Sequence, residues 1–152
     1  MFNLKIYSKS ILTPVILGSL ISFFISSSID YNTLQRPILS PPSVVFPIVW
    51  TILYILMGFS YGFLKSNNLN DSKVDSIYYF QLIVNLLWPI IFFVFKMRLF
   101  AFFWIIFLII LVINMIIKFY NKNIWSGLIQ IPYLIWLLFA TYLNLAIYLL
   151  NK

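Results

Sequence analysis

The sequence predicts an all-α integral membrane protein, built as a bundle of five transmembrane helices. Of its 152 residues, 63% are hydrophobic and only 9% are charged, whereas a soluble domain carries about 25% charged residues. The few charges also divide the chain into apolar runs, each long enough for a helix that crosses a bilayer, which takes about 20 residues. Because a helix satisfies its own backbone hydrogen bonds, lipid can surround it on all sides.

Charged residues mark the ends of each predicted span. The first run lies between Lys9 and Asp30, and the second lies between Arg36 and Lys65. Each run is interpreted as one helix of a single membrane domain that comprises residues 1–152. The five predicted spans are residues 13–29, 43–64, 77–95, 99–117 and 124–150.

The segment 30–42, called loop one below, is expected to act as a lid. Its sequence, DYNTLQRPILSPP, is rich in proline and partly apolar. Such a segment is expected to fold over the end of the bundle rather than extend into water.

The basic residues predict an orientation and a location. With the N-terminus inside, six Lys or Arg residues lie on the inner side and four on the outer side. The positive-inside rule then favours an internal N-terminus and an external C-terminus. The many Lys, Asn and Ile residues are typical of an AT-rich bacterial genome, so we expect the plasma membrane of a bacterium.

Composition excludes several kinds of chemistry. The chain has no Cys and no His, and its only acidic residues are Asp30, Asp71 and Asp75. Disulfides, thiolate nucleophiles and most zinc sites are therefore excluded, and the usual groups for acid–base or nucleophilic catalysis are missing from the spans. We expect no catalytic residue, no metal and no cofactor. Because the basic residues are spread over the whole chain, we expect them to contact lipid headgroups and not nucleic acid.

Three predicted spans carry a stripe of aromatic and amide side chains at helical spacing. Amides in such a stripe can join helices, and Trp or Tyr near span ends can form an interfacial belt. The alternative is that the stripes converge on an aromatic cavity for a flat apolar ligand. Span four has no such stripe, which predicts that it faces lipid or a second protomer. The stripes are Phe46, Trp50, Tyr54, Met57 and Tyr61; Gln81, Asn85, Trp88 and Phe92; and Tyr133, Trp136, Ala140 and Asn144.

Small residues and prolines complete the pattern. Gly58 and Gly62 lie four residues apart in span two, and Gly18, Ser22 and Ser26 recur at the same spacing in span one. Both patterns favour close helix packing, either within the bundle or in a homodimer. Pro89 and Pro132 lie inside spans three and five, and each is expected to kink its helix.

Three blocks of sequence resemble the tryptophan-rich sensory protein or translocator protein family, whose animal members are called peripheral benzodiazepine receptors. The first block, residues 34–58, has a basic residue before proline, a Pro-Pro pair, then Phe, Val-Trp and Leu-Tyr. The second is QLIVNLLW with a following Phe-Phe pair, at residues 81–93. The third is PYLIWLLFATYLN, at residues 132–144.

The resemblance implies a five-helix bundle, often dimeric, with a pocket beneath loop one. Family members bind porphyrins such as protoporphyrin IX and synthetic ligands of the isoquinoline carboxamide type, and animal members bind cholesterol. Some bacterial members are reported to promote breakdown of protoporphyrin by light and oxygen, and Trp50 and Trp136 match the pair linked to that photochemistry. The pocket residues implied by matching position are Tyr31, Trp50, Tyr54, Asn85, Trp88, Trp136 and Ala140.

Two positions of loop one depart from the family pattern. Asp30 stands where many members carry Trp, and Leu39 stands where a second aromatic residue is common. The lid would therefore be less aromatic than usual. We expect a membrane receptor or transporter for protoporphyrin IX and related tetrapyrroles. The alternatives are a light- and oxygen-dependent porphyrin-degrading activity, and a regulatory protein that binds lipid or sterol.

Overall fold

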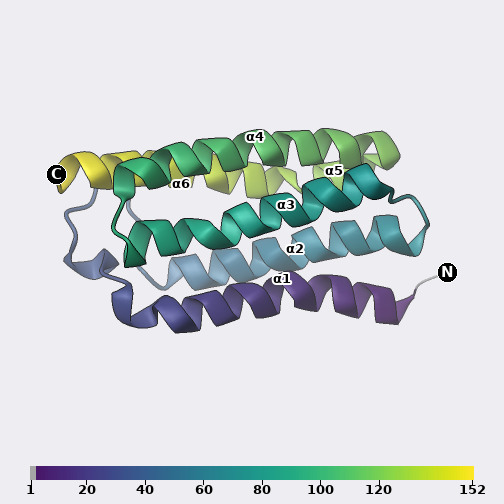
Figure 1. The fold of residues 1–152 in the computed structure, drawn as a ribbon, viewed down its shortest axis with the longest axis horizontal. Coiled ribbons are helices and arrows are strands. Elements are labelled where there is room, and N and C mark those ends of the chain that lie inside the picture. The colour runs from purple at the N-terminus through teal and green to yellow at the C-terminus, as the bar shows by residue number, and fades with distance from the viewer. Residues whose placement is uncertain (1–2) are drawn as a thin grey trace.

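The computed structural model describes residues 3–152, and this part of the chain is a bundle of antiparallel helices (Figure 1). The helices are α1 (Leu4–Ile25), α2 (Val45–Ser66), α3 (Ser72–Pro89), α4 (Arg98–Lys122), α5 (Ile124–Leu128) and α6 (Ile131–Leu150), with short helical turns η1 (Ser26–Ser28), η2 (Tyr31–Thr33) and η3 (Ile90–Val94). Five helical segments are long and apolar enough to cross a membrane, which confirms the predicted fold class. The start of α1 and the end of α6 lie at opposite ends of the bundle.

Helix α1 begins at Leu4, whereas the prediction placed the start of the first span at residue 13. The side chain of Asn3 accepts a hydrogen bond from the backbone N–H of Ile6 at 3.3 Å, and so caps the helix. Lys5 and Lys9 are exposed within the helix, where their long side chains can reach the headgroup region. The charges therefore mark the edge of the apolar stretch rather than the end of the helix.

Pro89 and Pro132 interrupt their predicted spans in different ways. The α-helix α3 ends at Pro89, and the chain continues as a π-helical turn, η3. The change occurs here because proline removes one backbone N–H donor. The fifth predicted span is broken into α5 and α6, and Pro132 lies in the first turn of α6. A proline ring clashes with the carbonyl four residues earlier, and Leu128 at that position is the last residue of α5.

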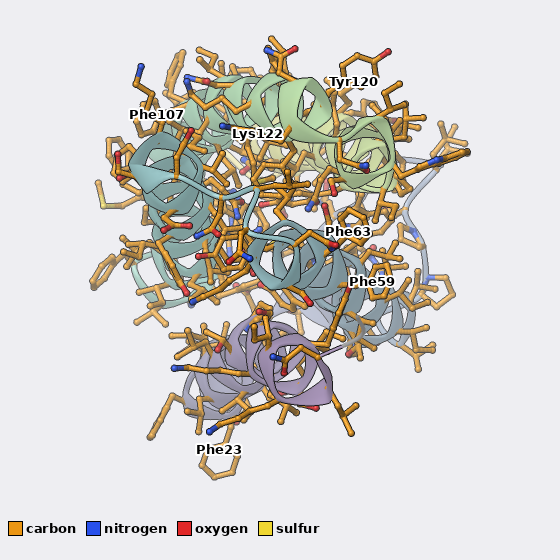
Figure 2. The ribbon with its side chains drawn as sticks, turned by 90° about the vertical axis from the view of Figure 1, so that its right-hand side faces the viewer. Phe23, Phe59, Phe63, Phe107, Tyr120 and Lys122 are labelled. Carbon is orange, nitrogen blue, oxygen red and sulfur yellow. The ribbon has the colours of Figure 1, made fainter. Side chains whose placement is uncertain are left out.

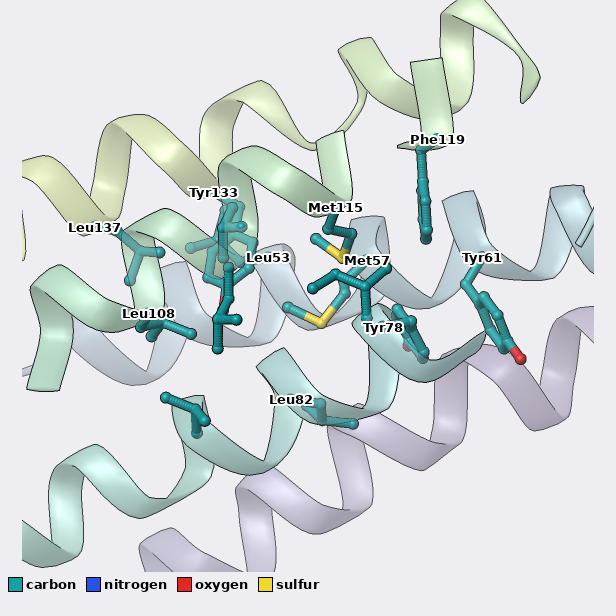
Figure 3. Packing of buried hydrophobic residues seen from close by; sticks show 14 of the residues in the cluster. Leu53, Met57, Tyr61, Tyr78, Leu82, Leu108, Met115, Phe119, Tyr133 and Leu137 are labelled. Carbon is teal, nitrogen blue, oxygen red and sulfur yellow. The ribbon is translucent and has the colours of Figure 1, made fainter. Parts of the chain in front are cut away.

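The prediction that span four is the most lipid-exposed helix is wrong, while its alternative, a face towards a second protomer, stays a prediction. Helix α4 packs against α3, α5 and α6, and its buried face contributes residues such as Leu108 and Met115 to the main core. Figure 3 shows these side chains directed into the space between the helices, together with Met57 and Leu137. Because α4 is apolar on every side, its sequence has no contrast from which to predict the buried face.

Helix α1 is the most exposed of the five spans. In its most apolar 18-residue stretch 17% of the residues are buried, compared with 33% for α4. Figure 2 shows α1 at one side of the bundle, with Phe23 pointing away from the other helices. Helix α1 packs mainly against α2, and the core of the bundle is formed by α2, α3, α4 and α6.

Gly58 holds α1 and α2 close together. A Cβ atom at Gly58 would lie 2.4 Å from the backbone oxygen of Ser10 and 2.5 Å from the Cα atom of Ile11. Gly62, one turn later, faces the side chain of Ser10. This pair of glycines is therefore used for packing within the chain.

Candidate functional site

The structure contains a cavity of about 630 Å³ beneath loop one, within the range of about 300–1,000 Å³ that is usual for small-molecule sites. Its walls come from α1, loop one, α2, α3 with η3, α4 and α6. All seven residues that the resemblance implies line this one cavity: Tyr31, Trp50, Tyr54, Asn85, Trp88, Trp136 and Ala140. Three elements far apart in the sequence thus bring their stripes together, while a ligand-binding role for the seven stays a prediction.

Aromatic rings form a connected wall from loop one to α6. The ring of Tyr31 lies edge-on to Phe46, with centroids 4.9 Å apart, and Phe46 lies edge-on to Trp136 at 5.9 Å. Trp50 contacts Tyr54 at 5.5 Å and Tyr133 at 6.2 Å. Three of these contacts are edge-to-face and the Trp50–Tyr54 pair is tilted; such contacts stabilise aromatic clusters and hold their faces in fixed directions.

Hydrogen bonds join α2, α3 and α6 beside the cavity. The Tyr54 hydroxyl donates to Oδ1 of Asn85 at 2.7 Å, and Nδ2 of Asn85 donates to the Tyr133 hydroxyl at 2.7 Å. The Tyr133 hydroxyl donates in turn to Oε1 of Gln81 at 2.9 Å. All four side chains are buried, so the network fixes the relative positions of the three helices.

A second polar contact orders the other side of the cavity. The indole N–H of Trp88 donates to Oδ1 of Asn144 at 3.0 Å, and Nδ2 of Asn144 donates to the backbone oxygen of Arg98 at 2.8 Å. The ring of Trp88 stacks on Phe92 with centroids 5.0 Å apart. Asn144 and Phe92 belong to the predicted stripes, and both line the cavity.

Helix α1 supplies a wall that the prediction missed. Gly18, Ser19 and Ser22 line the cavity, and a Cβ atom at Gly18 would lie 2.4 Å from the ring of Tyr54. The spacing of four between Gly18 and Ser22 by itself predicts only close helix packing. That these residues line a cavity follows from their position opposite the aromatic stripe of α2, which a reader of the sequence can recognise only after pairing α1 with α2.

Loop one is fastened to the bundle at its first residue and near its middle. Nη2 of Arg98 lies 2.6 Å from Oδ2 of Asp30, which ties the loop to the start of α4. The backbone of Gln35 exchanges two hydrogen bonds with the side chain of Asn151, of 3.0 and 2.8 Å. Within the loop, the Tyr31 hydroxyl donates to the backbone oxygen of Pro41 at 2.6 Å. These contacts fix Tyr31 over the end of the cavity.

The cavity has no charged wall. None of its lining residues is Asp, Glu, Lys or Arg, and the described residues 3–152 contain no cluster of side chains suited to holding a metal ion. The wall is apolar and aromatic, with a few neutral polar groups. Such a site can bury a flat aromatic molecule, and it offers no side chain for ordinary acid–base catalysis.

Comparison with known proteins agrees with this arrangement. Residues 10–150 match the sequence model of the TspO/MBR family. The tryptophan-rich protein TspO of Archaeoglobus fulgidus is 40% identical over 145 residues, which cover 93% of this chain and 94% of that protein. The protein of the same name from Chlorobaculum tepidum is 36% identical over 80% of this chain and 78% of its own length.

A third relative, the tryptophan-rich sensory protein of Cereibacter sphaeroides, is 34% identical over 80% of this chain and 76% of its own length. The match to the family model extends over almost all of the membrane bundle, from within α1 to the end of α6. It includes the aromatic and amide stripes that line the cavity. The chain therefore belongs to the TspO/MBR family of integral membrane proteins.

Proposed function

We propose that this protein is a membrane receptor or transporter that binds protoporphyrin IX and related tetrapyrroles in the cavity beneath loop one. One observation carries the proposal: Trp50, Trp88 and Trp136, from three different helices, line a single cavity with apolar walls. Indole rings can stack on a flat macrocycle or meet it edge-on, while the apolar walls bury its body. A relative that bears the name tryptophan-rich sensory protein supports a receptor role.

Titration with protoporphyrin IX tests the proposal. Purified protein in an uncharged detergent should show saturable quenching of its tryptophan fluorescence at a stoichiometry of about one ligand per chain. Replacement of Trp50 or Trp136 by Phe should weaken binding, since each indole has a larger face than a phenyl ring. Trp125→Phe is the matched control, because Trp125 is 70% exposed and does not line the cavity. Absence of saturable binding in the unmodified protein would contradict the proposal.

A second candidate is light-dependent oxidation of the bound porphyrin. It is favoured by the position of Trp50 and Trp136, which both line the cavity where a porphyrin would lie. Since the cavity has no acidic or basic side chain, the chemistry would have to come from the excited porphyrin and oxygen. Illumination of the complex should then destroy porphyrin faster than illumination of porphyrin in detergent alone. Equal rates of porphyrin loss with and without the protein would contradict the enzymatic function and would not affect the proposed binding function.

We further propose that the N-terminus lies inside and that loop one lies outside. The end of α2, the start of α3 and the end of α4 lie at the same end of the bundle as the start of α1, and loop one lies at the other end. These helix ends carry Lys65, Lys73, Lys118 and Lys122. An excess of basic residues marks the inner side of a membrane protein. Labelling of single cysteines placed at Lys73 and Ile38 with an impermeant reagent on intact cells tests this orientation. Modification at residue 38 alone is expected, and modification at residue 73 alone would show that the protein has the opposite orientation.

A further inference from the structure

We propose that the cavity holds only the uncharged body of a flat ligand, and that any carboxylate on the ligand stays at the rim beneath loop one, beside Arg36. The inference rests on the proposed function and adds the class of ligand that the site accepts and the direction in which the ligand lies. Its evidence is the distribution of charge and of free hydrogen-bonding groups around the cavity.

The interior of the cavity offers no cation to a carboxylate. No Lys or Arg is among its lining residues, and a buried carboxylate without a positive partner is strongly unfavourable. A ligand with two carboxylates therefore cannot place either of them deep between the helices. An uncharged ring system meets no such penalty.

Most polar groups of the cavity are already used by the protein. The amides of Asn85 and Asn144 both donate and accept within the bundle. The hydroxyl of Tyr54 donates to Asn85, and the indole N–H of Trp88 donates to Asn144. Thr51 donates to the backbone oxygen of Pro47 at 2.7 Å. The lining donors that remain are the indole N–H of Trp136, which is buried without a partner in the described structure, and the hydroxyls of Ser19, Ser22 and Ser43. All of them are neutral, so none supplies the positive charge that a buried carboxylate needs as a partner.

The rim beneath loop one differs from the interior because a cation lies there. The guanidinium carbon of Arg36 is 4.6 Å from the centroid of the Tyr31 ring, and Tyr31 is a wall of the cavity. Arg36 is exposed, and no ion pair among residues 3–152 includes it.

Two other cations at the same end, Arg98 and Lys96, are already engaged with a carboxylate of loop one. Arg98 lies 2.6 Å and Lys96 lies 3.9 Å from the carboxylate of Asp30. Arg36 is therefore the cation beside the cavity wall that can meet a ligand carboxylate without first breaking a contact with Asp30. A planar guanidinium also matches a carboxylate in geometry.

The test compares protoporphyrin IX, which has two carboxylates, with its uncharged dimethyl ester. Both are titrated in an uncharged detergent at pH 8 against the unmodified protein, Arg36→Gln, Arg36→Lys and Lys73→Gln. Lys73 is an exposed lysine at the opposite end of the bundle, so its replacement removes the same net charge far from the rim.

We expect the unmodified protein to bind the diester within about fivefold of the diacid, since the ion pair with Arg36 is the only contact that distinguishes them and the interior recognises neither carboxylate. Arg36→Gln should weaken diacid binding by about fivefold, the effect of one partly exposed ion pair, and leave diester binding unchanged. Arg36→Lys should keep most of the diacid affinity, and Lys73→Gln should change neither ligand.

Two results would overturn the inference while leaving the proposed function in place. Diester binding at least about tenfold weaker than diacid binding would mean that a carboxylate is recognised inside the cavity. Equal weakening of both ligands by Arg36→Gln would mean that Arg36 acts by holding the lid. Failure of both ligands to bind the unmodified protein is a different outcome, since it removes the proposed function itself.

Discussion

The hydroxyl of Tyr54 on α2 donates a 2.7 Å hydrogen bond to Oδ1 of Asn85 on α3. Through Nδ2 of Asn85 the contact continues to Tyr133 on α6. These helices have no water in the bilayer to replace a lost partner, so the side chains of this network depend on one another. The same amide thus stabilises the bundle and shapes one wall of the cavity.

Replacement of Asn85 by Leu should destabilise the bundle by about 1–2 kcal/mol. Two interhelical hydrogen bonds disappear, and the buried hydroxyl of Tyr54 is left without its acceptor. Single hydrogen bonds in membranes contribute about 0.6 kcal/mol on average, and an unsatisfied buried donor costs about 1–3 kcal/mol. Unfolding in mixed detergent micelles measures the change. Asn114→Leu is the control, because Asn114 is an exposed amide on α4; equal stability of the two variants would contradict the role of the network.

Gly58→Ala should destabilise the bundle more than Gly62→Ala. The new Cβ at residue 58 would meet the backbone of Ser10 and Ile11 at 2.4–2.5 Å, whereas the Cβ at residue 62 would meet the side chain of Ser10 at 3.1 Å. Backbone cannot move aside as a side chain can, so α1 must shift away from α2 at a cost of about 1–3 kcal/mol. Thermal unfolding in detergent gives the order of stability. If both variants unfold at the same temperature, the close approach at Gly58 is not required.

The sequence predicted the five spans because charge contrast along this chain is strong. Residues 45–64 and 77–94 are helical as predicted, and the seven cavity residues lie together as the resemblance implied. Helical spacing within each span was enough to place Trp50 with Tyr54 on one face. These features depend on local periodicity, which a single sequence records.

Features that depend on pairing between helices were not predicted. The buried face of α4 cannot be identified from the sequence because the helix is apolar on every side. The cavity wall formed by Gly18 and Ser22 depends on which helix packs against α1. The start of α1 was misplaced because Lys5 and Lys9 lie within the helix. In each case the missing information is tertiary, and local composition does not contain it.

Asp30→Asn should loosen loop one and destabilise the protein by about 1–2 kcal/mol. Oδ2 of Asp30 lies 2.6 Å from Nη2 of Arg98, whose side chain is only 14% exposed, so the pair falls between an exposed contact worth about 0–1 kcal/mol and a buried one whose loss costs about 3–5 kcal/mol. Hydrogen exchange of residues 30–42 should become faster, since one of the two attachments of the loop to the bundle is lost.

Lys96→Gln serves as the control for this contact. Nζ of Lys96 lies 3.9 Å from the same carboxylate, and its side chain is 59% exposed. Its replacement should therefore leave the exchange of loop one almost unchanged. If both variants speed up exchange equally, the attachment is a general effect of charge and not of the short Asp30–Arg98 contact.

Asp71 combines two stabilising contacts at the opposite end of the bundle, and they respond differently to substitution. Its Oδ2 lies 2.8 Å from Nζ of Lys122, and its Oδ1 accepts from the backbone N–H of Val74 at 2.9 Å, which caps α3. The hydrogen bond from Lys122, followed by that from Val74, lowers the pKa of Asp71 from 3.8 to about 2. A carboxyl group whose pKa is lower in the folded state stabilises that state when ionised. The contribution is thus complete above pH 4 and is lost as the pH falls from about 4 to about 2.

Thermal unfolding of the unmodified protein should therefore show a loss of stability in that pH window, which becomes smaller in Asp71→Asn. Asparagine retains a side-chain oxygen that can cap the helix but has no charge to lose. Asp71→Ala removes the cap as well, and should be less stable than Asp71→Asn at pH 7. In Lys122→Gln the pKa of Asp71 should move back towards its ordinary value, so the acid-dependent loss becomes smaller while the cap remains. An unchanged acid profile in Lys122→Gln would show that the helix cap alone lowers the pKa, because only the contact with Lys122 differs between these proteins.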